Sequence, residues 1–180
     1  MRINMKNKVS LAYIKLIIQN QLFDFQKLIM HEMEKKEMFR NEVSEWLDMD
    51  KYLEVLKVME TSYGTHALFN LGKRIGERIR VPAKINSLIL AINHLDKILR
   101  EYHQSDYLIR YRVLYVDYST KEILVKASSP YPCYFERGIF YAFCKRFKPD
   151  EAKLLNVELS NNQPGKSEDK YISYYKIIWL

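Results

Sequence analysis

The apolar residues of this sequence change their spacing at Tyr107, and this change limits the folds open to the chain. Before that position they recur every three or four residues, which is the period of a helix that buries one face. From Tyr107 to Tyr115 they recur at every second residue, which is the period of a strand with one buried face. Helices followed by strands predict an α+β domain.

Four stripes of the first half have the helical period. Gly64 is expected to end the helix of the second stripe, and Pro82 to begin that of the fourth. Gly72 and Gly76 stand beside the third stripe, where they favour a close approach by another helix or by a ligand. The stripes are Leu11–Ile29, Leu53–Met59, Leu68–Ile79 and Ile85–Tyr102.

The second half predicts two hairpins separated by one helix. Strands are expected from Tyr107 to Tyr115 and from Ile123 to Ala127, a helix from Phe135 to Phe147, and strands over 155–159 and 171–179. We therefore expect an N-terminal helical subdomain packed on a four-stranded antiparallel sheet. Residues 1–45 are expected to form an N-terminal helix and charged extension, and residues 46–180 the globular α+β domain, within one globular unit overall.

Composition narrows the class of protein. Hydrophobic residues make up 48% of the 180 residues, which is typical of a globular chain, and two cysteines do not make a disulfide framework. No uncharged apolar run is long enough to span a membrane. We expect a cytoplasmic protein without a membrane partner. The net charge of +7 is spread among acidic residues, so nucleic acid is not the expected partner.

No catalytic motif is recognisable. The sequence has no glycine-rich phosphate loop and no Gly-x-Ser-x-Gly nucleophile turn, and its cysteines and histidines do not have zinc-ligand spacing. We therefore predict a protein that is not an enzyme. Cys133 precedes a helix, whose N–H groups would lower its thiol pKa; the alternative is a half-buried side chain that anchors the loop.

Tyrosine is abundant, with 14 in the chain, and many of them fall on the predicted strands. Tyr111 is central in the first of these. Such a face suits an aromatic or amphipathic ligand, and it suits a dimer interface equally well.

One segment resembles a known superfamily. Pro130-Tyr131-Pro132-Cys133-Tyr134-Phe135-Glu136-Arg137-Gly138-Ile139, followed by Phe147-Lys148-Pro149, is similar to bacterial ligand-sensing domains of the haem-NO-binding and 4-vinyl-reductase-like superfamily. The ending Tyr174-Tyr175-Lys176-Ile177-Ile178-Trp179 looks like their last strand, and Gly64, Leu71-Gly72 and Pro82 look like their central helices. The similarity covers roughly residues 46–180.

The resemblance implies a ligand pocket between the helices and the sheet, and a sensory role. The haem-NO sensors hold the haem propionates with Tyr-x-Ser-x-Arg, whereas Tyr118-Ser119-Thr120 has another spacing and the segment 171–175 lacks the arginine. We therefore expect no cofactor; the alternative is haem held by His94 or His103. The expected ligand-binding residues are Cys133, Phe135, Arg137, Gly138, Gly72 and Tyr111.

Three functions remain open. The first is a non-catalytic sensor for a small apolar or amphipathic ligand, dimeric, which passes its signal to a separate protein. The second is a haem-based gas sensor that uses His94 or His103. The third is a scaffold without a pocket, which binds another protein through its tyrosine-rich surface.

Overall fold

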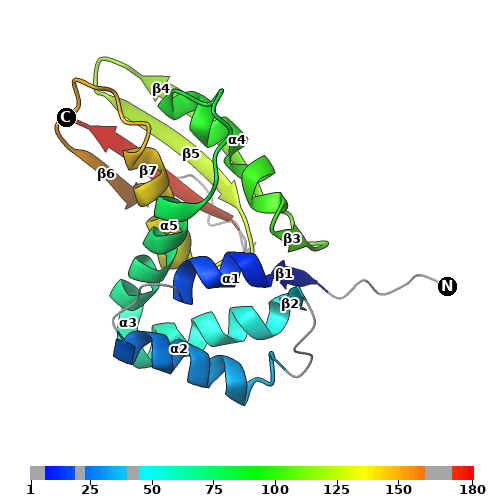
Figure 1. The fold of residues 1–180 in the computed structure, drawn as a ribbon. Coiled ribbons are helices and arrows are strands. Elements are labelled where there is room, and N and C mark those ends of the chain that lie inside the picture. The colour runs from blue at the N-terminus through cyan, green and yellow to red at the C-terminus, as the bar shows by residue number, and fades with distance from the viewer. Residues whose placement is uncertain (1–6, 19–22, 40–44, 161–171) are drawn as a thin grey trace.

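The computed structural model describes residues 7–18, 23–39, 45–160 and 172–180, and Figure 1 shows the path of the chain. Its described elements are β1 (Lys8–Ser10), α1 (Leu11–Ile18), α2 (Phe23–Lys35), β2 (Trp46–Asp48), α3 (Met49–Arg78), α4 (Leu88–Arg100), β3 (His103–Gln104), β4 (Arg110–Asp117), β5 (Glu122–Ser128), α5 (Cys133–Lys145), β6 (Leu155–Leu159) and β7 (Ile172–Trp179).

The larger sheet is antiparallel throughout and has the strand order β4-β5-β7-β6. Hairpins β4–β5 and β6–β7 flank α5 in the sequence, as predicted. Helix α4 packs against β4 and α5 against β6, so the helices contact both edges of the sheet. The inward residues Val125, Tyr175 and Val157 are fully buried, whereas Arg112 points to solvent. The expected α+β architecture is confirmed.

One detail of β4 differs from the prediction. Tyr111 and Tyr115 were expected on the same face, but Tyr111 is buried and Tyr115 is 44% exposed. The register with β5 shifts between Val113 and Tyr115, which leaves Leu114 as an extra residue in β4. Such a bulge reverses the alternation of side chains beyond it.

A small second sheet joins the start of the chain to its middle. Strand β1 lies between β2 and β3, and Val9 is opposite both Leu47 and His103. Val9 is fully buried there. The sequence did not predict this sheet, because strands of two or three residues are too short to show an alternating pattern.

The helix boundaries follow their capping residues. Asp48 accepts hydrogen bonds from the backbone N–H groups of Asp50 and Lys51 and begins α3. Ser87 begins α4, so the expected start at Pro82 is wrong. The first apolar stripe belongs to two helices, α1 and α2; Leu22 lies outside the described residues.

Gly64 does not end a helix as expected but sits at a kink inside α3. Its φ of 80° and ψ of 171° belong to a region that glycine alone enters without strain. The helix direction changes there, and a second helical segment begins at Thr65. Within the described residues, no helix is both long and apolar enough to cross a membrane.

Candidate functional site

Aromatic side chains from four parts of the chain meet in the interior. We call the following residues the aromatic cluster: Tyr13, Tyr52, Tyr102, His103, Tyr131 and Phe135. The ring centroids of Tyr13 and His103 are 5.1 Å apart, and those of Tyr131 and Phe135 are also 5.1 Å apart. Helices α1, α3 and α5 and strand β3 therefore converge on this cluster.

His103 is the polar centre of the cluster. Its Nδ1 lies 2.5 Å from the carbonyl oxygen of Leu99, and its Nε2 is hydrogen-bonded to the hydroxyl of Tyr131. Because a carbonyl oxygen only accepts, Nδ1 carries the proton and Nε2 presents its lone pair. Burial lowers the pKa of His103 to about 4, so the imidazole is neutral at physiological pH.

Two tyrosine hydroxyls of the cluster are buried, and that of Tyr13 faces the hydroxyl of Tyr131 without forming a well-aligned hydrogen bond. The side chains of Tyr13 and Tyr52 are 0% and 1% exposed, and neither hydroxyl oxygen has a hydrogen-bond partner of acceptable geometry in the described part of the chain. A buried hydroxyl without a partner costs about 1–3 kcal/mol. A polar ligand or a water molecule at this position would recover that energy.

A second buried polar group lies between α5 and the sheet. Glu136 is 2% exposed and accepts hydrogen bonds from the hydroxyls of Tyr111, at 2.9 Å, and Tyr175, at 2.8 Å. Burial raises the pKa of this carboxyl. Tyr111, an expected ligand residue, is thus hydrogen-bonded to Glu136. Glu136 was not among the residues expected at the site.

The expected pocket residues Gly72 and Gly138 lie where α3 crosses α5. A Cβ atom on Gly72 would be 1.8 Å from the carbonyl oxygen of Phe135, and one on Gly138 would be 2.1 Å from that of Phe69. These glycines serve the contact between two backbones, and this contact leaves no room for a ligand beside them. Phe135 is fully buried among the aromatic cluster.

Cys133 is half-buried at the start of α5. Burial raises the pKa of its thiol, so the thiolate suggested by its place at a helix N-terminus is not favoured. The other candidate histidine, His94, lies on α4 with its Nδ1 2.8 Å from the carbonyl oxygen of Leu90 and is not part of the aromatic cluster. Among the described residues, no group of three or more histidines, cysteines and carboxylates is placed to hold a metal ion.

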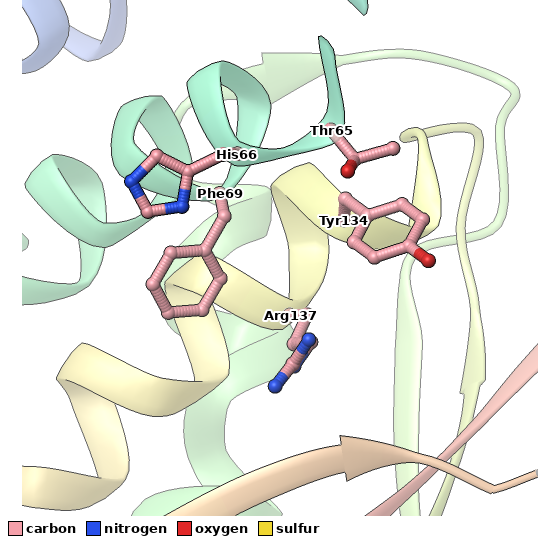
Figure 2. Close-up of a pocket in the computed structure, with 5 residues that line it drawn as sticks. All are labelled: Thr65, His66, Phe69, Tyr134 and Arg137. Atoms are coloured by element: carbon pink, nitrogen blue, oxygen red, sulfur yellow. The ribbon is translucent and has the colours of Figure 1, made fainter.

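Arg137, another expected ligand residue, lines a surface pocket. This pocket, of about 190 Å³, lies between α3 and α5 and is lined by Thr65, His66, Phe69, Tyr134 and Arg137. Figure 2 shows Arg137 below the rings of Phe69 and Tyr134. We call it the α3–α5 pocket.

Comparisons with known proteins identify the fold. Neither a family model nor a curated protein matches the sequence. Solved H-NOX domains match the structure over most of its length. They include a mutant of the T. tengcongensis H-NOX (15% identity, TM-score 0.61, 93% of each chain covered) and an H-NOX protein from a study of haem distortion (14% identity, TM-score 0.61, covering 92% of this chain and 91% of that one).

A third similar structure is an oxygen-binding H-NOX domain related to soluble guanylate cyclases (12% identity, TM-score 0.54, covering 93% of this chain and 91% of that one). At these identities the comparisons establish a shared fold. They support the resemblance to haem-NO-binding domains at the level of the fold, whereas the resemblance to 4-vinyl-reductase-like domains stays a prediction.

The comparisons contradict the expectation of no cofactor. Structures with this fold come from studies of haem redox potential and haem distortion. That expectation depended on a missing Tyr-x-Ser-x-Arg segment. Tyr131-Pro132-Cys133-Tyr134-Phe135 shares only its tyrosine with that motif, because cysteine and phenylalanine stand where the motif has serine and arginine.

The side chains around His103 test whether haem fits. A neutral imidazole whose Nδ1–H is held by a carbonyl has the donor chemistry of an iron ligand. The residue four positions after Tyr131, however, is Phe135, which is fully buried and carries no charge that could pair with a propionate. The hydroxyl of Tyr131 already occupies Nε2. Among the described residues of the aromatic cluster an iron donor is therefore present but no cation for the propionates is, and Tyr131 has to turn away before Nε2 can bind iron.

Proposed function

We propose that this protein is a non-catalytic, haem-based gas sensor in which His103 is the iron ligand. The observation that carries the proposal is the state of His103: neutral, oriented by Leu99, and directed into a buried cluster that holds the unsatisfied hydroxyl of Tyr52. The H-NOX fold of the chain supports it. A bound haem would supply the iron at which a diatomic gas binds.

The position of His103 suggests how a signal would leave the site. His103 belongs to β3 and is paired with Val9 of β1, which leads directly into α1. A movement of the imidazole away from Tyr131 would shift β3 and, through β1, the helical layer. The receiver would be a separate signalling protein, and a homodimer is the expected assembly.

A second candidate is a sensor for a small amphipathic ligand. It is favoured by the fact that Phe135, and not a cation, lies beside Tyr131 in the cluster. In this case the hydroxyls of Tyr13 and Tyr52 would donate to the ligand. The two candidates share the site and differ in whether His103 binds iron.

Haemin titration of the purified protein separates the candidates. We expect a Soret band that persists after desalting, that is lost in His103→Gln and that is kept in His94→Gln, the matched change on α4. Circular dichroism checks that each variant is folded.

Failure of the unmodified protein to retain haemin would reject the haem sensor and leave the amphipathic-ligand sensor, whose ligand would appear in native mass spectra. Loss of the Soret band in His94→Gln, with retention in His103→Gln, would contradict the assignment of the iron ligand to His103.

A further inference from the structure

The shape of the α3–α5 pocket depends on a kink in the backbone of α3. The kink at Gly64 starts a new helical direction at Thr65, which brings Thr65 and His66 over the N-terminal turn of α5 (Figure 2). A Cβ atom on Gly64 would have no neighbour within 4 Å, so the glycine is required by the backbone angles and not by lack of space.

Arg137 gives the α3–α5 pocket its charge. Its Nε donates to the carbonyl oxygen of Val157 at 2.6 Å, and its guanidinium carbon lies 5.5 Å from the ring centre of Phe69. These two contacts fix the plane of the guanidinium. In the described part of the chain, no hydrogen bond or ion pair engages its two terminal nitrogens. An oriented guanidinium with both of these nitrogens available matches the two oxygens of a carboxylate.

Aromatic rings form the walls of the pocket. The rings of His66 and Phe69 are stacked, with centroids 6.5 Å apart and planes 22° apart. Tyr134 lies on the opposite side of the opening, next to Thr65 (Figure 2). A flat apolar body between these walls would contact rings on both sides, while its polar end meets Arg137.

We propose that the α3–α5 pocket binds a small aromatic monocarboxylate, whose carboxylate pairs with Arg137 and whose ring lies between Phe69 and Tyr134. A single guanidinium lines the pocket, so its charge matches a ligand with one negative charge. The volume decides for a small molecule, since about 190 Å³ is below the roughly 300–1,000 Å³ of sites for drug-sized ligands. This site is separate from His103 and does not depend on haem.

Fluorine NMR tests the proposal with 4-fluorobenzoate as the probe and 4-fluorobenzamide as its neutral isostere. Broadening or a shift of the benzoate signal on addition of the full chain is expected, with the amide binding at least about tenfold more weakly. The expected ratio follows from a charge-assisted hydrogen bond of about 1.5–3 kcal/mol. Arg137→Gln should weaken the binding of benzoate about tenfold or more.

Arg112→Gln is the matched control, because Arg112 is an exposed arginine on β4. It should leave the affinity unchanged. Tyr134→Ala, which removes one wall, should weaken the binding of benzoate severalfold. If circular dichroism shows that Arg137→Gln does not fold, the affinity of Tyr134→Ala is the test of the site. Three results would each overturn the proposal. They are equal binding of the amide, unchanged affinity in folded Arg137→Gln, and absence of binding by the unmodified chain at 10-millimolar probe (on the order of the weakest specific affinities).

Discussion

His103 changes its protonation equilibrium on folding. Its pKa falls from 6.5 to about 4, chiefly because burial disfavours the imidazolium. Between these values the unfolded chain binds more protons than the folded chain, so the free energy of unfolding rises with pH in this window. The contribution of His103 is complete above pH 6.5 and is lost as the pH falls towards 4.

We predict that His103→Gln flattens this pH dependence. The full shift corresponds to somewhat more than about 3 kcal/mol, and partial exposure of the ring reduces this to about 2–3 kcal/mol. Urea unfolding between about pH 4 and 7 should therefore show a difference between the unmodified protein and the variant that changes by this amount. His94→Gln, at a half-exposed histidine, serves as the control. Parallel curves for the unmodified protein and His103→Gln would show that the histidine is not responsible.

Glu136 changes the free energy of unfolding with pH in the opposite direction to His103. The effect of His103 is therefore measured as a difference between the unmodified protein and the variant. Burial raises its pKa above 4.5, so the folded chain holds this proton to a higher pH than the unfolded chain. Its contribution to stability is present at low pH and is lost as the pH rises through the raised pKa. The unmodified protein reports the sum of both groups, whereas the comparison with His103→Gln isolates the histidine.

At the scale of elements, the contact between α3 and α5 holds the helical layer to the sheet. Gly72, Gly76 and Gly138 allow the two backbones to approach so closely that a methyl group at any of them would meet backbone or Cβ atoms within 3 Å. Arg146 of the loop after α5 strengthens the same contact, because its guanidinium donates to the carbonyl oxygens of Gly76 and Ile79.

Gly138→Ala is therefore expected to be strongly destabilising. Its methyl group would lie 2.1 Å from the carbonyl oxygen of Phe69, which is backbone and cannot turn aside as a side chain does. Overpacking costs about 1–3 kcal/mol or more, and we expect a loss at the upper end of this range in chemical denaturation. Lys145→Ala, at an exposed position of the same helix, should change the stability little. A Gly138→Ala protein as stable as the unmodified chain would show that α3 and α5 can separate at no cost.

Much of this element-scale organisation was predictable from the sequence, for a physical reason. Elements with long periodic patterns, such as α4 and the strand that contains Tyr175 and Ile177, were found. The bulge at Leu114 and the three-residue strand β1 were not, because a single inserted residue or a very short strand leaves no periodic signal.

The site was harder to predict than the fold. Tyr13, Tyr52 and His103 come from segments distant in the sequence, and only folding brings them together. Arg137 was expected at a ligand site and does line a pocket, but at the surface between α3 and α5. Gly72 and Gly138 were noticed for their small size, which serves the crossing of the helices.

At the scale of the whole molecule, the first segment of the chain is part of the core. Strand β1 is the middle strand of the small sheet, and the side chains of Val9, Ile14 and Ile17 are at most 2% exposed. Burial of three such side chains contributes about 5–9 kcal/mol, which is comparable to the total stability of a typical domain. The expected boundary at residue 45 would therefore cut through an energetically connected unit.

We predict that the fragment 46–180 does not fold alone. Without β1, the strands β2 and β3 lose their common partner, and Tyr102 and His103 lose their contacts with Tyr13. The fragment should give poorly dispersed amide NMR signals and no cooperative thermal transition. Co-expression with the fragment 1–45 should restore both, and Val9→Asp in that smaller fragment should prevent the rescue, because it places a charge in the buried centre of the small sheet. A cooperative transition of fragment 46–180 by itself would instead establish the first 45 residues as a dispensable extension.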